Sequence, residues 1–405
     1  MFRRYNAAST GCNRCRHGDP ISHFARAWTG SYKLSYLTGA RQVPGRGRSD
    51  VTVCDVLFST RFAAATATLY AAATLVSGCT ADTNSADNHK PQAPITSTTK
   101  VASAGVLGNQ RRPDESCAPD PAPRDGGPEL RPVRHAAGTT QVKADPLRIA
   151  VLTPDALDSL CALGLQSRIV TASSERSYLG TVVHKVPVSG SPDAPDLAAV
   201  RTAHPDLIIG SEAMSPAQYK ALSAIAPTVF TAVPGPAWQN NMRIVGAATG
   251  RGGPANGLLD AFNSDAAKTG SQTDAPHFQA SVVQLTANTV RVYGAASFPG
   301  SVLAAVGVDR PVPQRFIDKP YHEINIANDA DYSAADGDIV YVAFDSPAAK
   351  ARAAALFESP AWKKLSANRE NRVFVVNNEV WQTGEGIVAA RGMLDDLRWL
   401  NAPIN

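Results

Sequence analysis

The sequence predicts an α/β fold with two lobes, each a β-α-β sheet flanked by helices, joined by a connecting helix and preceded by a disordered N-terminal region. From residue 147 onward, short β-branched runs alternate with apolar segments of helical period, as in parallel sheets covered by helices. One long helical stretch, residues 234–276, divides this alternation into two parts. Before residue 147, large apolar residues are sparse and Pro, Ser, Thr and Asp are common, which is typical of unfolded chain.

Composition and charge narrow the class of protein. With 44% hydrophobic and 18% charged residues, the chain of 405 residues has an ordinary globular balance. The formal net charge of +4 comes from the Arg-rich residues 1–79, and the remainder is mildly acidic. No nucleic-acid partner is therefore expected, because such a partner needs a concentrated basic surface.

Residues 57–78 have the pattern of a secretory signal. Arg61 precedes an apolar, small-residue run, and Ser77 and Gly78 stand directly before Cys79. The run is shorter than the roughly 20 residues that a membrane-spanning helix needs. The motif resembles the lipobox of bacterial lipoproteins, so we expect lipidation of Cys79 and anchoring to the outer face of the cytoplasmic membrane. The alternative is a buried Ala-rich helix that ends in a chance Gly-Cys.

The segments around this signal have separate interpretations. Residues 1–56 are too long and irregular to begin a signal, and we interpret them as an extension from a misassigned translation start. Residues 79–146 are predicted to be a flexible tether. Cys117 and Cys161 remain after cleavage and lipidation, and an oxidising compartment favours a disulfide between them. The alternative is two unpaired cysteines, with Cys161 packed as a small apolar residue.

Residues 147–233 are predicted to form the N-terminal lobe. Pro154 and Asp155 open its first helix, and Gly164 ends that helix. We expect strands at 148–152, 168–172, 207–210 and 228–231, and helices at 154–163, 196–203 and 216–225.

Residues 234–276 are predicted to be the connecting helix, and residues 277–405 the C-terminal lobe. Gly250 and the Gly-Gly-Pro sequence at 252–254 interrupt the helical pattern, which leaves the stiffness of the connecting helix open. In the C-terminal lobe we expect strands at 281–285, 290–293, 339–344 and 373–376, and helices at 301–306, 348–357 and 387–400.

Short sequence blocks follow one another in a fixed order from residue 147 to the end. They are Pro-Asp-Leu at 195–197, His-Pro-Asp-Leu-Ile-Ile at 204–209, Ile-Ala-Pro-Thr-Val at 225–229, Val-Tyr-Gly at 292–294 and Asn-Arg-Val-Phe-Val-Val at 371–376. This series resembles the helical-backbone (class III) ABC solute-binding proteins, and in particular FecB-like iron-siderophore-binding lipoproteins.

The resemblance implies a monomeric binding protein without a cofactor of its own. Its partner would be a small-molecule iron chelate, a ferric siderophore, held in the cleft between the lobes for iron acquisition. Binding of haem or cobalamin is an alternative, as is an envelope interaction lipoprotein without importer coupling. The residues themselves disfavour an enzyme, because residues 147–405 contain no G-x-S-x-G, H-E-x-x-H or phosphate-loop motif.

Candidate ligand-binding residues are the Arg and aromatic side chains in and after the predicted strands, where ligands of open α/β sheets bind. Arg binds chelate oxygens with a planar fork, and aromatic rings stack on the chelate. Arg291 and Tyr293 share one strand face, and the alternative for both is burial against the connecting helix. The alternative for Trp381 is core packing, and the alternative for Trp238 is a contact that staples the start of the helix. The predicted set is Arg291, Tyr293, Trp381, Trp238, Tyr321, Arg315, Phe298, Tyr178 and Glu212.

Coupling to an importer is a separate question. In the class that the sequence resembles, each lobe presents a Glu to arginines of the membrane permease. Ala198 and Ala304 occupy these two positions here. Asp193 and Asp309 are nearby carboxylates that would substitute for them. The alternative is a ligand store, or a hand-off partner within the envelope, that does not dock on a conventional importer.

Overall fold

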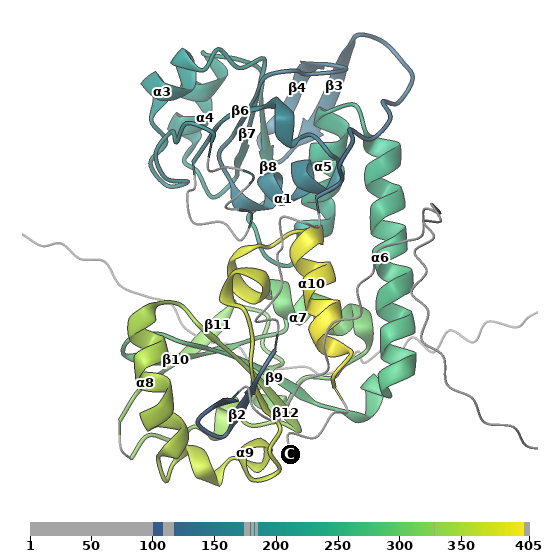
Figure 1. The fold of residues 1–405 in the computed structure, drawn as a ribbon. Coiled ribbons are helices and arrows are strands. Elements are labelled where there is room, and N and C mark those ends of the chain that lie inside the picture. Colours follow the sequence, from purple (N-terminus) through teal and green to yellow (C-terminus); the bar gives the residue numbers. More distant parts are fainter. Residues whose placement is uncertain are drawn as a thin grey trace, which may run out of the picture. The chain divides into compact units, whose positions relative to one another are not determined.

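The described chain forms two lobes, each built around its own sheet (Figure 1). The predicted N-terminal extension, the signal segment and the lipidation site Cys79 lie outside the described residues, as does Tyr178. The computed structural model describes residues 100–107, 117–173, 179, 182, 185–327 and 329–400.

The first lobe contains a four-stranded parallel sheet, as predicted. Its strand order is β6-β5-β7-β8, so the chain leaves β5 in one direction and returns past it to β7. Asp196 caps α3 by accepting hydrogen bonds from two backbone N–H groups, and Ser215 with Gln218 forms a capping box before α4. The elements are β5 (Ile149–Val151), α1 (Pro154–Ala162), β6 (Ile169–Ala172), α3 (Leu197–Thr202), β7 (Leu207–Ser211), α4 (Pro216–Ser223) and β8 (Thr228–Thr231).

The second lobe contains a seven-stranded mixed sheet in the order β1-β2-β13-β12-β9-β10-β11. Strands β2 (Ala104–Val106), β13, β12 and β9 are parallel to one another. Strand β1 (Lys100–Val101) pairs antiparallel with β2 at one edge, and β10 and β11 add as antiparallel strands at the other. The elements are β9 (Ala280–Leu285), β10 (Thr289–Tyr293), α7 (Phe298–Val306), β11 (Tyr321–Asn325), β12 (Ile339–Phe344), α8 (Pro347–Glu358), α9 (Ser366–Arg369), β13 (Val373–Val375) and α10 (Ile387–Leu397).

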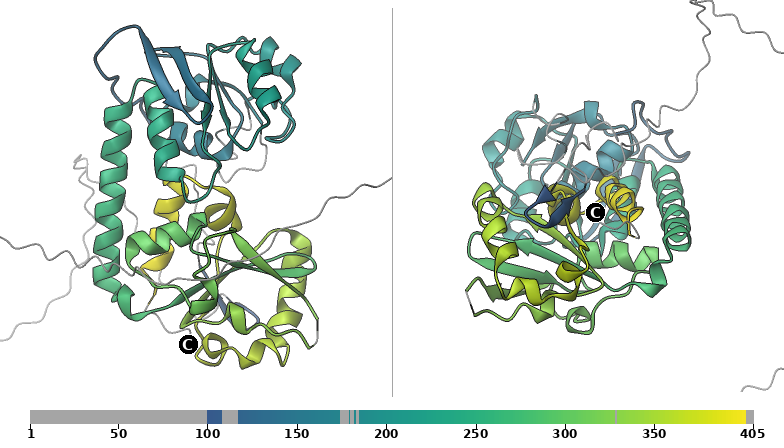
Figure 2. Two further views of the ribbon diagram at one scale, coloured as in Figure 1. Left: turned by 180° about the vertical axis from the view of Figure 1, so that it is seen from behind. Right: turned by 60° about the horizontal axis from the view of Figure 1, so that its bottom comes forward.

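The predicted connecting helix is two helices, α5 (Trp238–Ala248) and α6 (Gly252–Thr273). Gly250 separates them with a φ of +68°, and a Cβ there would lie 2.0 Å from the carbonyl oxygen of Ala144. The Gly-Gly-Pro sequence begins α6 instead of interrupting a helix, and α6 continues for 22 residues. Figures 1 and 2 show α6 as one long rod beside α5, and it also contacts α7 and α10.

The prediction of a flexible tether over 79–146 is wrong where the structure describes that segment. Strands β1 (Lys100–Val101) and β2 (Ala104–Val106) extend the second-lobe sheet through β13. Strands β3 (Leu130–His135) and β4 (Gly138–Lys143) form a hairpin that contacts β8 of the first lobe. β1 and β2 are only two and three residues long, and β3 and β4 carry several polar side chains. Their order depends on contacts with β13 and β8, far away in sequence, which local composition does not reveal.

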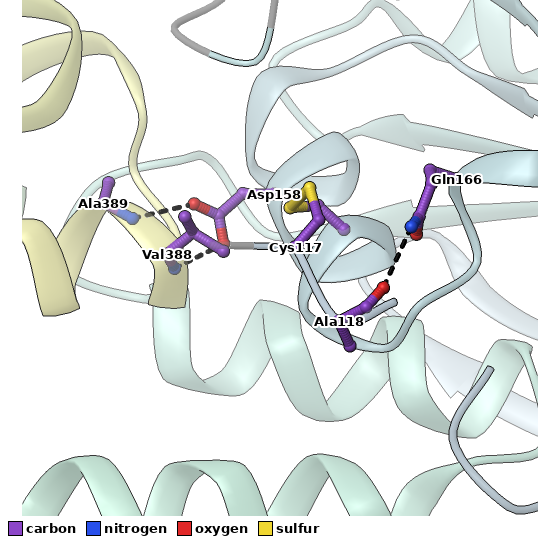
Figure 3. The surroundings of a disulfide bond; sticks show 7 residues. Cys117, Ala118, Asp158, Gln166, Val388 and Ala389 are labelled. Atoms are coloured by element: carbon purple, nitrogen blue, oxygen red, sulfur yellow. Dashed lines mark hydrogen bonds between the residues drawn. A yellow bond between two sulfur atoms is a disulfide. The ribbon is translucent and has the colours of Figure 1, made fainter. Parts of the chain in front are cut away.

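The predicted disulfide between Cys117 and Cys161 is present, with the two Cα atoms 4.6 Å apart (Figure 3). Two hydrogen bonds support the same junction. Ala118 N donates to Cys161 O over 3.1 Å, and Gln166 Nε2 donates to Ala118 O over 2.9 Å. The segment before the hairpin is therefore fixed to α1.

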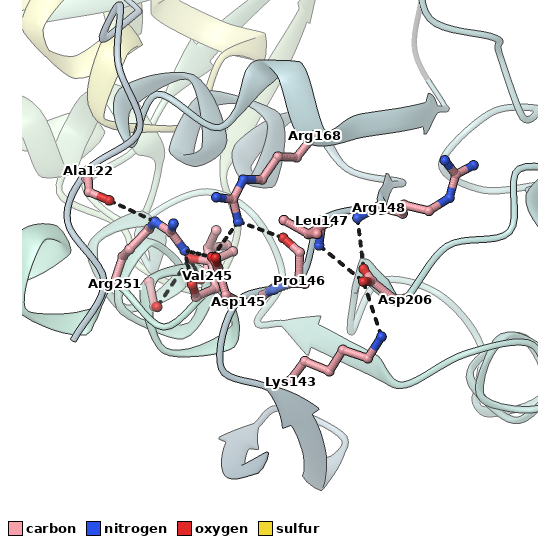
Figure 4. A network of polar contacts seen from close by, with 12 residues as sticks. Ala122, Lys143, Asp145, Pro146, Leu147, Arg148, Arg168, Asp206, Val245 and Arg251 are labelled. Atoms are coloured by element: carbon pink, nitrogen blue, oxygen red, sulfur yellow. Dashed lines mark hydrogen bonds and ion pairs between the residues drawn. The ribbon is translucent and has the colours of Figure 1, made fainter. Parts of the chain in front are cut away.

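A charged network holds the end of the hairpin to the rest of the first lobe (Figure 4). Asp145 Oδ1 lies 2.5 Å from Arg168 Nη1 and 2.9 Å from Arg251 Nη1. Burial alone would raise the pKa of Asp145, but the two guanidinium groups hold that pKa below its ordinary value. Asp145 thus joins three segments: the end of β4, the start of β6 and the start of α6.

The largest hydrophobic core is continuous from one lobe to the other. It contains Ile149 and Leu160 of the first lobe together with Val282, Phe298 and Tyr341 of the second. Two smaller cores cover the opposite faces of the two sheets. Because apolar burial contributes roughly 25 cal/mol per Å², the shared core favours a fixed arrangement of the lobes.

Candidate functional site

The carboxyl edge of the first sheet carries a row of buried hydroxyl groups. Thr153 follows β5, Ser173 follows β6, Ser211 ends β7 and Thr231 ends β8. The chain reverses its direction of travel across this sheet at β5, and such a point opens a crevice beyond the strand ends. Ser173 Oγ has no hydrogen-bond partner within the described residues. This edge therefore offers polar groups to a bound molecule.

Asp155, at the start of α1, lies behind this edge. Its carboxylate accepts hydrogen bonds from the Thr153 hydroxyl and, over 3.0 Å, from Asn241 Nδ2. Burial raises the pKa of Asp155, and these hydrogen bonds oppose the rise without cancelling it. Asn241 in turn accepts from Ala232 N and donates to Ala232 O, which fixes its side chain.

The second lobe presents a cluster of polar and aromatic side chains on one face of its sheet. Gln284, Arg291 and Glu323 lie opposite one another on β9, β10 and β11, and Tyr293 lies opposite Tyr321. Tyr293 packs against the shared core, so this is the sheet face that carries that core. We call these five residues the Arg291 cluster.

Hydrogen bonds order the Arg291 cluster around Gln284. Gln284 Oε1 accepts from Tyr293 Oη over 3.1 Å and from Arg291 Nη1 over 3.3 Å. Arg291 Nε also lies 2.8 Å from Glu323 Oε1, and its guanidinium is 4.8 Å from the centre of the Tyr321 ring. The rings of Tyr293 and Tyr321 are 5.3 Å apart. Their edges and the guanidinium form one surface.

The ionisation states in this cluster are well defined. Burial raises the pKa of Tyr293, so its hydroxyl remains protonated and donates to Gln284. The Arg291 side chain is 30% exposed. Burial alone would lower the pKa of Arg291, but the hydrogen bond to Glu323 and the charge interactions with Tyr321, Tyr293 and Glu323 together raise that pKa above its ordinary value. A permanently charged, partly exposed guanidinium beside two aromatic rings is suited to an oxygen-rich anionic molecule with flat faces.

The lobes meet at the start of α10. Asp158 of α1 accepts hydrogen bonds from Val388 N over 2.9 Å and from Ala389 N over 3.0 Å (Figure 3). Burial raises the pKa of Asp158 to about 7, although these two donors oppose the rise. A carboxyl group of the first lobe thus caps a helix of the second.

The structure corrects the predicted site for three aromatic residues. Trp238, Phe298 and Trp381 are 2%, 1% and 0% exposed, so they pack in the core and present no ring to a ligand. Trp238 Nε1 donates to Ser301 Oγ over 3.0 Å, and Trp381 Nε1 donates to Asp396 Oδ2 over 2.7 Å. The alternative interpretation of Trp381, core packing, is what the structure has, and Trp238 packs in the core at the start of α5.

Two further predicted residues lie apart from the Arg291 cluster. Arg315 is exposed and forms an ion pair of 2.6 Å with Asp309. Glu212 lines a separate surface hollow of about 370 Å³, together with Arg134, His135 and Asn240. The structure brings together Arg291, Tyr293 and Tyr321 of the predicted set.

Sequence reasoning did not select Gln284 or Asp155, and between β13 and α10 it selected Trp381 alone. Gln284 could have been found from the sequence, because it is the one amide side chain in the mostly apolar strand β9. Asp155 also had a signal in the sequence, but the start of a helix explains an acidic residue equally well. The turn before α10 had none, because its irregular backbone has no sequence period.

Among the described residues, no group of three or more His, Cys, Asp or Glu side chains is arranged to hold a metal ion. Within the same residues, no helix is both long and apolar enough to cross a membrane.

Two α/β lobes that are built on separate sheets and share one hydrophobic core have the architecture of a two-lobed solute-binding protein. The chain belongs to the periplasmic binding protein family, whose model matches residues 149–380.

Relatives with similar sequences carry names that refer to binding of a siderophore or of achromobactin. The chain is 30% identical over 285 residues to a probable siderophore-binding lipoprotein of Bacillus subtilis, covering 66% of this chain and 87% of the relative. It is 28% identical to the achromobactin-binding periplasmic protein of Dickeya dadantii, covering 62% and 85%. Among solved structures, it is similar to Staphylococcus aureus SirA complexed with staphyloferrin B, at 26% identity and a TM-score of 0.59, covering 66% and 97%.

Proposed function

We propose that this protein is a lipid-anchored, extracytoplasmic receptor that binds a ferric siderophore between its lobes for iron acquisition. The observation that carries the proposal is the group formed by Arg291, Tyr293 and Tyr321, in which a partly exposed guanidinium lies beside two aromatic rings. The names of the relatives support the choice of ligand, since one is a probable siderophore-binding lipoprotein and another binds achromobactin.

The chemistry of the surface fits a metal chelate. The Arg291 guanidinium would bind carboxylate, hydroxamate or phenolate oxygens of the chelate, and in doing so would share its donors with Glu323. Tyr293 and Tyr321 would stack on the apolar faces of the chelate. The iron enters as cargo inside the chelate, so the protein itself needs to recognise only the organic shell.

The anchor and the delivery step complete the proposal. Lipidation of Cys79 would hold the protein at the outer face of the cytoplasmic membrane, in keeping with the relative named a lipoprotein. Ala198 and Ala304 are both exposed, at the positions where the class usually presents Glu. Asp309 is already paired with Arg315. Delivery to an ABC importer would therefore depend on other contacts, and co-purification with a stoichiometric permease from native membranes tests for it.

Calorimetric titration tests ligand capture. The ligands are ferric staphyloferrin B, ferric achromobactin, haemin and cyanocobalamin, each added to the purified full chain. We expect a ferric siderophore to bind with a Kd at or below micromolar, and haemin and cyanocobalamin not to bind. Binding of haemin or cyanocobalamin alone, or of none of the four ligands, contradicts the proposal.

A further inference from the structure

A short segment after the last strand lies between the Arg291 cluster and helix α1 of the first lobe. It runs from Asn378 to Gly386 and contains the π-helical turn η7 (Glu379–Thr383). At its start, Asn378 Oδ1 accepts a hydrogen bond of 2.7 Å from Gln284 in the Arg291 cluster. At its end, a Cβ on Gly386 would lie 2.2 Å from the carboxyl carbon of Asp158. The segment therefore lies where the lobes meet.

Gln382, within η7, has a buried amide without a partner. Its side chain is 7% exposed, and neither Nε2 nor Oε1 has a hydrogen-bond partner in the part of the chain that the structure describes. Native proteins satisfy most buried polar groups, so an amide with both ends unmet requires an explanation. π-helical turns are frequent at functional sites. A ligand that supplies one donor and one acceptor would satisfy this amide.

Glu385 lies three residues further along the same segment. Its backbone has a φ of 50°, in the left-handed region that residues other than glycine seldom adopt, and it is only partly exposed. Burial raises the pKa of Glu385 to about 8, and the nearby Asp155 of α1 adds to the rise. Tyr293 of β10 is the titratable group that interacts with Glu385 from the second lobe. At neutral pH Glu385 is therefore protonated and offers both a donor and an acceptor.

We propose that Gln382 and Glu385 together bind a neutral amide or hydroxyl group in the organic backbone of the chelate. The inference rests on the proposed function, because it assigns these residues to the same ligand. Arg291 recognises charged oxygens, whereas this pair recognises the uncharged linker between the iron-binding groups. The pair therefore distinguishes chelates that hold iron alike but differ in their linkers.

The first test compares affinity with stability in Gln382→Met. The ligand is whichever of ferric staphyloferrin B and ferric achromobactin the unaltered protein binds, and Gln141→Met on exposed β4 is the matched control. We expect about tenfold weaker binding, as for loss of a hydrogen-bonding side chain, while the Tm of the ligand-free protein stays equal or rises because an unsatisfied amide is gone. A purely structural role would lower both affinity and Tm, and unchanged affinity overturns the inference.

The second test uses pH and does not depend on the first variant folding. We expect the affinity of the unaltered protein to fall above pH 8, as Glu385 loses its proton. Glu385→Gln, which keeps a donor, would lack this fall between pH 6.5 and 9.5. Identical pH profiles overturn the inference while the proposed function stands. If neither ferric siderophore binds the unaltered protein, the proposed function fails and the inference fails with it.

Discussion

Arg291 is the single residue on which ligand capture depends most in this account. Its guanidinium is 30% exposed, lies 2.8 Å from Glu323 and stands over the Tyr321 ring. Its strand neighbours fix its position, so little side-chain freedom is lost when a ligand binds. The charge is available because Glu323 is itself 44% exposed and can be hydrated when the ligand takes its place.

We expect Arg291→Met to weaken binding of a ferric siderophore by about 10- to 100-fold, as for loss of a charge-assisted hydrogen bond. Arg291→Lys would recover only part of the affinity, because an ammonium group lacks the planar fork. Isothermal titration calorimetry measures both variants, with Arg243→Met on the exposed side of α5 as control. Affinity that survives Arg291→Met unchanged would rule out this role.

Glu385 predicts the direction of a stability change with pH in the ligand-free protein. The pKa of Glu385 in the folded protein is about 8, which lies above its ordinary value. The favourable contribution of Glu385 to the free energy of unfolding is therefore complete below that ordinary value, and it is lost as the pH rises through 8. We expect Glu385→Gln to melt higher than the unaltered protein at pH 9, by a margin that shrinks toward pH 6. Thermal melts of both proteins at pH 6 and pH 9 measure this difference in Tm, and a difference in Tm that does not change with pH would contradict the prediction.

At this scale the sequence predicts residue types better than it predicts their directions. Arg291 and Tyr293 alternate on a strand, and this period correctly places them on one face. Trp238 and Trp381 lie in the connections after predicted strands, and both rings are buried in the core. An aromatic residue in a connection serves packing and stacking equally well, and only the tertiary structure distinguishes the two.

Among the elements, α10 shows how one lobe stabilises the other. Its first N–H groups are capped from α1 by Asp158, which is fully buried. We expect Asp158→Ala to lower the free energy of unfolding by about 1–2 kcal/mol at pH 8, where the carboxyl is mostly ionised. The free energy of unfolding of Asp158→Asn, which keeps one acceptor, would lie between that of the unaltered protein and that of Asp158→Ala. Urea denaturation measures the series, and equal stability of the alanine variant would contradict the cap.

The disulfide gives a second prediction for elements. Cys117 and Cys161 are separated by 44 residues, and closing a loop of that size stabilises a protein by about 4 kcal/mol in the chain-entropy account. We expect the double variant Cys117→Ser and Cys161→Ser to unfold at lower urea concentration by a corresponding amount. Adding a reductant should produce the same shift in the unaltered protein and none in the double variant.

The elements with strong local periods were predictable, and those stabilised from a distance were not. Strands β5, β7, β8 and β12 match their predicted positions to within two residues, because buried parallel strands are continuous apolar runs. Strand β11 was missed because it lies at a sheet edge and carries polar side chains, and β1 and β2 were missed because they are only two and three residues long. Gly250 predicted an interruption of the connecting helix. The structure has a boundary between two separate helices, α5 and α6, at this residue.

Over the whole described chain, the two lobes act as one binding unit. A single hydrophobic core includes residues of both sheets, α6 runs alongside α5, α7 and α10, and Asp158 joins the lobes through hydrogen bonds. A ligand bound between such lobes meets groups that are already placed, so the cost of ordering the site is low. Docking on an importer would also involve both lobes, because exposed Ala198 and Ala304 lie on different lobes.

The most direct measurement is a crystal structure of the full chain with ferric staphyloferrin B or ferric achromobactin, with iron located by its anomalous scattering. The account predicts one iron peak between the Arg291 cluster and the carboxyl edge of the first sheet, with chelate oxygens at hydrogen-bond distance from Arg291. An iron peak elsewhere on the molecule, or a chelate that leaves Arg291 and Tyr321 untouched, would contradict it.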